Sequence, residues 1–331
     1  MEYVWENRYC TTCIICITRT PHTYTGIASR LILIKAGGFI LIIMLGFALK
    51  TKGVCTREHG SFLSTIIMNI TLPCSLLSSI NNLEITPILL VALACGFLGN
   101  VITNLSGYLI QKKESPMTRA LSMINSSGYN IGTFTLPFVQ SFFPSNLIGY
   151  VCLFDTGNAL MCLGGTYSAA STVVANEEKQ SFKTVAKKLF SSIPFCTYII
   201  LFFLSLFHIA IPTQILTVTS IAGNANAFLA MLMIGILLEI KLDLSQIRLI
   251  KKILLNRYAV TLGLSLFVYF ILPIDLTVKK MIILCLCSPI SAVAPVFSNR
   301  LGSRSPVPSA INSLSIIISI FIMTILILFM V

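Results

Sequence analysis

Charged residues are scarce in this chain of 331 residues. Asp, Glu, Lys and Arg make up only 10% of it, whereas an ordinary soluble domain carries roughly 25%. Hydrophobic residues account for 56%. So few charges cannot cover the surface of a soluble protein, and most of the outer surface must face lipid. The composition therefore excludes a soluble enzyme and predicts an integral membrane protein without a large soluble domain.

Chemically reactive groups are few as well. The three histidines are far apart in the sequence and offer no nucleophile and base pair, so we expect neither an enzyme nor a cofactor. Most of the eleven cysteines lie inside apolar runs, where cysteine behaves as a small hydrophobic residue. Only Cys10, Cys13 and Cys16 have a metal-like spacing, and no matching Cys or His pair follows to complete a site. We therefore expect no metal.

Apolar runs predict an all-α fold of ten membrane-spanning helices, because a helix needs about 20 apolar residues to cross a bilayer. The runs do not alternate between apolar and polar residues as barrel strands do. The expected spans cover residues 31–50, 61–80, 87–110, 120–143, 147–170, 193–211, 215–238, 254–273, 279–300 and 308–331.

Lys and Arg concentrate in alternate connections. The connections after the odd-numbered spans hold 17 of them, Arg257 included, and those after the even-numbered spans hold only Lys279 and Lys280. The positive-inside rule then makes the odd-numbered connections cytoplasmic and puts both termini outside the plasma membrane. Basic residues spread over short loops, without interleaved aromatic residues, exclude nucleic-acid binding.

The longest connection, residues 171–192, divides the spans into two halves, 31–170 and 193–331. Residues 1–30 form a polar N-terminal extension to which we assign no function. Because each half has five spans, the second half enters the membrane in the opposite orientation to the first. Such inverted repeats are typical of secondary transporters, whose binding sites lie at interrupted helices near the midplane.

The fourth span of each half carries residues that break helices. Pro137 in one, and Pro289 and Pro295 in the other, should interrupt these spans, and the freed backbone must line a cavity or be buried in protein. The start of each second half-helix favours an anion, and the end of each first half-helix favours a cation. An ordinary proline kink is the alternative. The two stretches are Asn125-Ser-Ser-Gly-Tyr-Asn-Ile-Gly-Thr-Phe-Thr-Leu-Pro137 and Ser288-Pro-Ile-Ser-Ala-Val-Ala-Pro295.

Asp155 is the only acidic residue near the middle of a span. With no Lys or Arg expected at the same depth, burial favours its neutral form, and a carboxyl that alternates between neutral and charged can carry a proton. Asn158 lies on the same helical face. The alternative is an Asp that stays protonated and only joins helices.

Other polar residues recur with an offset of about half the chain. Asn69 corresponds to Asn224, and Asp155 corresponds to Asn312. Such residues either contact substrate or join helices by hydrogen bonds. The candidate substrate-binding residues are Asn69, Asn130, Gly132, Pro137, Asn224, Ser291 and Asn312.

These stretches resemble the auxin efflux carrier family, which includes bacterial malate permeases and plant PIN-type carriers. The resemblance covers about residues 33–331. It implies two crossing broken helices, a small organic anion as substrate, and alternating access between a scaffold domain (spans 1, 2, 6 and 7) and a transport domain. The stretches are Gly46 to Val54, Asn69 to Pro73, Asn130 to Phe138, Asp155 to Asn158, Met233 to Leu238, Pro289 to Pro295 and Asn312 to Ser315.

The sequence departs from the family in its N-terminal extension and in the polar, crowded Thr133-Phe-Thr135. The short central loop argues against auxin as the substrate. We expect a proton-coupled carrier of an anion such as malate. The nearest alternative is a sodium-coupled symporter of the bile-acid type, and a channel is a further one. A homodimer is compatible with the sequence.

Overall fold

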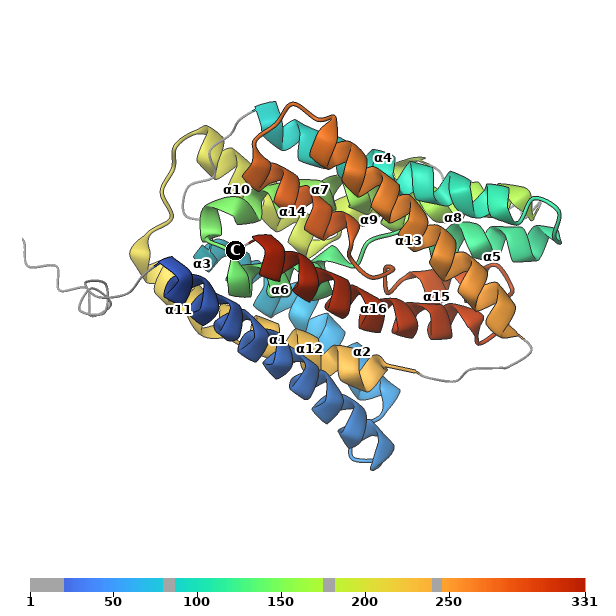
Figure 1. Ribbon diagram of the computed structural model, residues 1–331, viewed down its shortest axis with the longest axis horizontal. Helices are drawn as coiled ribbons and strands as arrows, with labels where there is room; N and C mark the ends of the chain where they lie inside the picture. Colours follow the sequence, from blue (N-terminus) through green and yellow to red (C-terminus); the bar gives the residue numbers. More distant parts are fainter. Residues whose placement is uncertain (1–20, 80–86, 175–181, 240–245, 331) are drawn as a thin grey trace, which may run out of the picture.

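The computed structural model describes residues 21–79, 87–174, 182–239 and 246–330. These ranges form helices joined by short connections and contain no β-strand, which confirms the all-helical expectation for them (Figure 1). Residues 1–20 of the extension expected at 1–30 lie outside the described residues. From Pro21 onward the chain is already helical, so the first helix begins ten residues before the expected span.

The helices are separated by few residues, and three π-helical turns occur among them. These turns are Ile67–Thr71, Ile131–Thr135 and Met161–Gly165. The helices are α1 (Pro21–Thr51), α2 (Arg57–Ile66), α3 (Leu72–Ser79), α4 (Pro87–Ile110), α5 (Pro116–Ser126), α6 (Leu136–Phe142), α7 (Ile148–Leu160), α8 (Thr166–Val173), α9 (Phe182–Phe190), α10 (Ile193–Leu206), α11 (Thr213–Gly223), α12 (Asn226–Leu237), α13 (Ile247–Phe270), α14 (Leu276–Leu286), α15 (Ala294–Arg300) and α16 (Val307–Met330).

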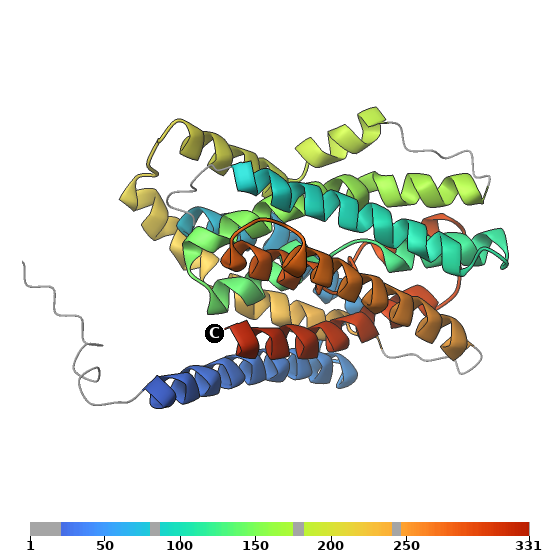
Figure 2. The same cartoon turned by 45° about the horizontal axis from the view of Figure 1, so that its top comes forward.

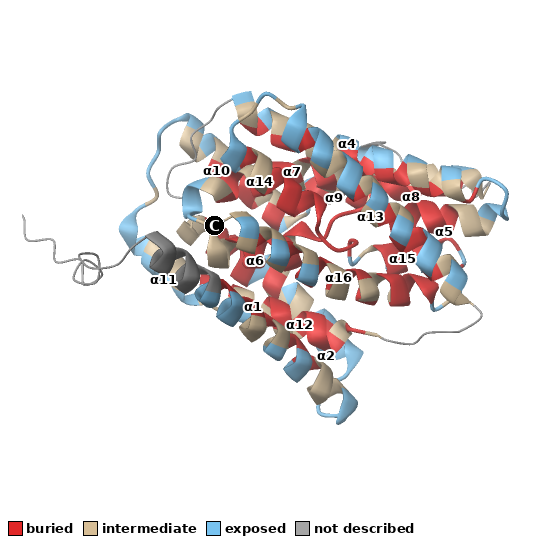
Figure 3. Ribbon diagram, viewed as in Figure 1, coloured by how far each residue is buried: buried red, intermediate tan, exposed pale blue. Residues whose placement is uncertain are grey.

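Seven helical segments in the described ranges are long and apolar enough to cross a membrane, and α9 with α10 makes an eighth if this pair, bent by 74°, counts as one span. Exposed residues lie along the outer faces of the helices (Figure 3), and many of them are large and apolar. Ile34, Ile221 and Leu255 are each at least 70% exposed. Such a surface is stable in contact with lipid rather than water.

Two further segments expected to span the membrane are interrupted. α5 ends at Ser126, residues 127–130 are not helical, and helix resumes at Ile131. α14 ends at Leu286, and α15 begins at Ala294. Pro289 in the second break has no backbone N–H to donate. We call residues 127–130 the first break and residues 287–293 the second break.

The connection expected over residues 171–192 is partly helical. α8 continues to Val173, and α9 follows after the undescribed residues 175–181. Val185 and Leu189 are buried, and Lys183 and Lys187 on α9 are exposed. Apolar residues four positions apart place one face of a helix against the protein, which explains why this polar stretch is helical.

The helices pack in two groups. One group contains α1, α2, α3, α10, α11 and α12, and the other contains α4, α5, α7, α8 and α13 to α16. α6 contacts both groups, and α1 lies beside α16 at their boundary (Figures 1 and 2). The start of α1 and the end of α16 lie at one end of the bundle, and the connections from α1 to α2 and from α4 to α5 lie at the other (Figure 1).

Reciprocal glycines bring helices close together within each group. A Cβ atom on Gly96 of α4 would overlap the carbonyl oxygen of Phe154 on α7, and a Cβ on Gly157 of α7 would overlap that of Leu93 on α4. Gly46 of α1 and Gly235 of α12 stand in the same relation. Small residues at such contacts let backbones approach where no hydrophobic effect drives helix association.

Gly157→Val is expected to destabilise the protein in detergent by about 1–3 kcal/mol, because the new side chain must push α4 and α7 apart. Thermal unfolding of the purified protein measures this. Gly263→Val is the matched control, since Gly263 lies in α13 with nothing within 4 Å of its Cβ position. Equal midpoints for the two variants would contradict the close packing of α4 on α7.

Candidate functional site

The two breaks meet near the middle of the bundle. The N–H of Asn130 in the first break donates to the carbonyl oxygen of Pro289 in the second break, at 2.9 Å. The hydroxyl groups of Thr135 and Ser288 form a hydrogen bond of 2.5 Å. The ends of four half-helices therefore lie close together, and the backbone groups that the breaks release are concentrated in one place.

Two asparagines hold the first break. Asn158 on α7 bonds both backbone groups of Tyr129: its Oδ1 accepts from the N–H at 3.0 Å, and its Nδ2 donates to the carbonyl oxygen at 2.8 Å. Asn100 on α4 accepts from the N–H of Gly128 and donates to Asn158, at 2.6 and 3.0 Å. Asn100 is fully buried, and a buried backbone group without a partner would cost about 1–3 kcal/mol.

The second break is held in the same way from α16. The hydroxyl group of Ser315 accepts from the N–H of Ile290 at 3.1 Å, and Nδ2 of Asn312 donates to the carbonyl oxygen of Ile290 at 3.0 Å. Asn312 also donates to the carbonyl oxygen of Ser291, at 3.2 Å. Asn312 is thus bonded to the backbone of the break instead of lining the cavity.

A cavity of about 310 Å³ adjoins the first and second breaks. Each of the three π-helical turns contributes to its wall, through Met68, through Ile131 to Thr133, and through Cys162 with Leu163. π-turns are often found at functional sites. From the breaks the cavity extends toward the end of the bundle where α2 and α10 begin, where Ser64, Ser192 and Pro194 line it.

Five of the residues proposed from the sequence line this cavity: Asn130, Gly132, Asp155, Asn158 and Ser291. Asn130 and Ser291 are each 8% exposed, and Gly132 follows directly in the turn that starts the second half-helix. The structure thus brings together residues from the two halves of the chain.

Other proposed residues lie elsewhere. Asn69 and Asn224 are exposed and do not line the cavity, because the local helix direction turns both away from it. Asn226, two residues after Asn224, is buried and accepts a hydrogen bond from Thr71 at 3.0 Å, which joins α12 to the turn before α3. The three prolines, Pro137, Pro289 and Pro295, shape the helices around the breaks without lining the cavity.

Asp155 connects the two helix groups. Its Oδ1 accepts from Nδ2 of Asn158 at 2.9 Å, and its Oδ2 accepts from the hydroxyl group of Tyr198 on α10 at 3.0 Å. Tyr198 also lines the cavity. Tyr198 is not among the residues proposed from the sequence, and the available signal is the single tyrosine in the mostly apolar α10. Asp155 forms no ion pair within the described residues.

Arg257 corrects the count of loop residues. It lies inside α13 with 1% of its surface exposed, not in a cytoplasmic connection. α13 begins at Ile247, seven residues before the expected span of 254–273. Arg257 lies within the expected span as well as within the observed helix. A basic side chain therefore does reach the depth of the breaks, contrary to the expectation. Asn100 is a second buried polar residue that was not proposed from the sequence. The one available signal for it was a polar residue inside an apolar span.

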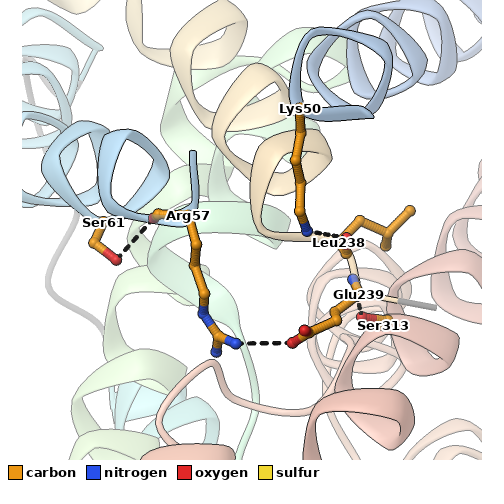
Figure 4. Close-up of polar contacts among 6 residues, drawn as sticks. All are labelled: Lys50, Arg57, Ser61, Leu238, Glu239 and Ser313. Carbon is orange, nitrogen blue, oxygen red and sulfur yellow. Dashed lines mark hydrogen bonds and ion pairs between the residues drawn. The ribbon is translucent and has the colours of Figure 1, made fainter. Parts of the chain in front are cut away.

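At the end of the bundle where α2 begins, polar contacts hold the chain where it leaves α12 (Figure 4). Nζ of Lys50 donates to the carbonyl oxygen of Leu238, and Arg57 pairs with Glu239, both at 2.8 Å. The N–H of Glu239 donates to the hydroxyl group of Ser313 on α16 at 2.9 Å. Among these contacts, only the one between Glu239 and Ser313 joins this group of helices to the other. The ion pair of Arg57 with Glu239 is largely exposed and contributes about 1 kcal/mol or less.

In the part of the chain that the structure describes, no group of three or more His, Cys, Asp or Glu side chains is placed to hold a metal ion. The groups around the cavity are instead amides, hydroxyls, one carboxyl and apolar side chains. They suit the binding of a small polar molecule or ion by hydrogen bonds.

Comparison with known families agrees with this arrangement. The family model described as "Membrane transport protein" matches residues 38–327. The chain belongs to this family. It is the family of auxin efflux carriers and PIN-like proteins that the sequence resembles. Membership makes the protein a multi-pass membrane transport protein. Among curated proteins, none matches the chain significantly.

Gly128→Ala is expected to disturb the crossing of the two breaks. Gly128 has a φ of 83°, which costs an alanine about 1–2 kcal/mol, and its Cβ would lie 2.8 Å from Cβ of Ser291. Gly302→Ala is the matched control, because Gly302 has a φ of 92° and nothing within 4 Å. Thermal unfolding should show a larger loss for Gly128→Ala, and equal losses would contradict the close contact.

Proposed function

We propose that the protein is a secondary transporter that moves a small organic anion, with malate as the first candidate, across the plasma membrane by alternating access coupled to protons. The observation that carries the proposal is a cavity at the meeting point of two broken helices, with the carboxyl group of Asp155 in its wall. Membership of a transport family supports the general class.

The proposed topology has ten spans in two inverted repeats. Seven continuous segments, the bent pair α9 and α10, and the two interrupted pairs together supply ten. Asn158 and Asn312, 154 residues apart (158 to 312), each donate to a backbone carbonyl of the nearby break. Equal roles at this offset, three residues from the correspondence of Asp155 with Asn312, favour a repeat. The excess of basic residues in the odd-numbered connections supports a topology with both termini outside the cell.

Alternating access requires two bodies that move against each other. The group of α1 to α3 and α10 to α12 corresponds to the proposed scaffold domain, and the group that contains both breaks corresponds to the proposed transport domain. Packing contacts are close within each group through the glycines described above. Contacts between Asp155 and Tyr198 cross the boundary and must change when the bodies move.

The anion would be held where the second half-helices begin. Backbone N–H groups at the start of a helix lack intrahelical partners and carry partial positive charge. Those near Gly132 and Ala292 adjoin the cavity, together with the side chains of Asn130 and Ser291. A cavity of about 310 Å³ is at the lower end of the range for small-molecule sites, about 300–1,000 Å³, and suits a small ligand.

Asp155 would couple the anion to a proton through electrostatic repulsion. A Cβ on Gly132 would lie 3.8 Å from Oδ2 of Asp155, so an anion bound there lies beside the carboxyl group. Two like charges about 4 Å apart repel by about 4 kcal/mol at an effective dielectric constant of about 20. A neutral Asp155 removes this repulsion, and anion and proton therefore bind together.

The first test is uptake of labelled malate into proteoliposomes, with and without an imposed pH gradient. The wild-type protein should show saturable uptake that depends on the gradient, and Asp155→Asn should remove that dependence because an amide cannot titrate. Asp275→Asn is the matched control, since Asp275 caps α14 at the surface and asparagine also caps helices. A sodium requirement at fixed pH would point to the sodium-coupled alternative.

Gradient-driven uptake by Asp155→Asn would exclude Asp155 as the coupling group. Absence of malate uptake by the wild-type protein would exclude malate, and other carboxylates would then be compared in the same vesicles.

Tyr198→Phe is expected to move the pH midpoint of uptake upward by about one unit or more. The ionised carboxylate loses a hydrogen bond of about 1.5–3 kcal/mol, and 1.36 kcal/mol corresponds to one pH unit. The initial uptake rate as a function of pH measures this. Tyr269→Phe is the control, because Tyr269 is 47% exposed on α13. An unchanged midpoint would show that the contact between Tyr198 and Asp155 has no role in coupling.

A further inference from the structure

Arg257 makes three contacts at the crossing of the two breaks. Its Nη1 donates to the carbonyl oxygen of Ser126 at 2.7 Å, and its Nη2 donates to the carbonyl oxygen of Ser288 at 3.3 Å. The guanidinium group also lies over the ring of Tyr129, 4.4 Å from its centre. One side chain from α13 therefore contacts Tyr129 in the first break and Ser288 in the second break.

One of the two carbonyl groups that Arg257 contacts belongs to the end of a half-helix, and the other lies just beyond the end of a second half-helix. Ser126 is the last residue of α5, and Ser288 follows two residues after the end of α14. The last carbonyl groups of a helix lack intrahelical partners, and each helix end carries about half a negative charge. Two such ends supply about one negative charge, which matches the charge of a single guanidinium group.

No carboxylate competes for this role. Within the described residues Arg257 forms no ion pair, and both oxygens of Asp155 are bonded to Asn158 and Tyr198. A buried cation that lacks its opposite charge is costly in a membrane interior. The helix ends and the aromatic face of Tyr129 are the groups that stabilise it.

Carbonyl groups at the ends of broken helices are also the groups that hold coupling metal cations in transporters of this general design. In this protein the guanidinium group already occupies them. We propose that Arg257 is a tethered cation that takes the place of a coupling metal ion at the crossing, so that the transport cycle needs no sodium. The role in transport rests on the proposed function, whereas the occupation of the carbonyl groups does not.

The position of Arg257 supports this assignment. Asn100 on α4 and Arg257 on α13 lie 157 residues apart (100 to 257), close to the offset between Asn158 and Asn312. Asn100 contacts the first break from α4, which precedes it, Arg257 contacts the second break from α13, which precedes it, and both are buried. The first position holds a neutral amide and the second holds a permanent charge, because arginine does not lose its proton in proteins. The cation is therefore present throughout the cycle.

The test removes the tether and offers a free cation in its place. Thermal unfolding of purified Arg257→Ala is measured in choline chloride and again with sodium chloride or a low, non-denaturing concentration of guanidinium chloride. The variant should unfold several degrees below the wild-type protein in choline, and guanidinium or sodium should recover part of that loss. The wild-type protein should show no such recovery, since its site is filled.

Arg119→Ala is the matched control. Arg119 also donates to backbone carbonyl groups, those of Lys112 and Glu114, but it does so at the surface and away from the breaks. Its midpoint should not respond to sodium or guanidinium. Arg257→Lys should lie between Arg257→Ala and the wild-type protein, because one ammonium group keeps the charge but cannot match the fork that reaches both carbonyl groups.

Three results would overturn the proposal. The first is an Arg257→Ala midpoint equal to that of the wild-type protein or unresponsive to either cation. The second is failure to purify Arg257→Ala even when guanidinium is present, whereas purification that succeeds only with guanidinium supports the proposal. The third is a sodium requirement for uptake by the wild-type protein. Failure to transport malate under every condition concerns the proposed substrate, and the unfolding measurements remain decisive for Arg257.

Discussion

The backbone groups released by the two breaks are the constraint on which the rest of the structure depends. In the lipid interior no water satisfies a free N–H or carbonyl group, so such groups need a partner from the protein unless they line a cavity. Asn100, Asn158, Asn312, Ser315 and Arg257 supply these partners from four different helices. The breaks can therefore exist only where these helices converge, and the cavity follows from their meeting.

The same side chains connect the breaks to the carboxyl group in the cavity. Arg257 lies over Tyr129, Asn158 bonds the backbone of Tyr129, and Asn158 also donates to Asp155. Tyr198 then joins Asp155 to α10 in the other group of helices. Asp155 is thus connected both to the crossing of the breaks and to the contact between the two groups.

Composition and local chemistry were enough to predict much of this molecule. Apolar runs predicted the helices, and Pro289 predicted the second break. A break was also expected in the fourth span, but it lies at residues 127–130 and not at Pro137, which is inside α6. Asp155 stood out because a carboxyl group is rare in an apolar span. Asn130, Gly132 and Ser291 reach the cavity because they lie in or beside the breaks themselves.

The tertiary structure decided what the long-range contacts do. Asn69 and Asn224 face away from the cavity, and Asn312 bonds the backbone of the second break, because the direction of a side chain depends on how each helix is rotated in the bundle. Tyr198 and Arg257 gain their roles from helices that pack beside the breaks although they are distant in sequence. The sequence by itself determined which spans break, since that depends on neighbouring residues. Only the packed structure determined which side chains satisfy those breaks, since hydrogen bonds form between groups that are close in space.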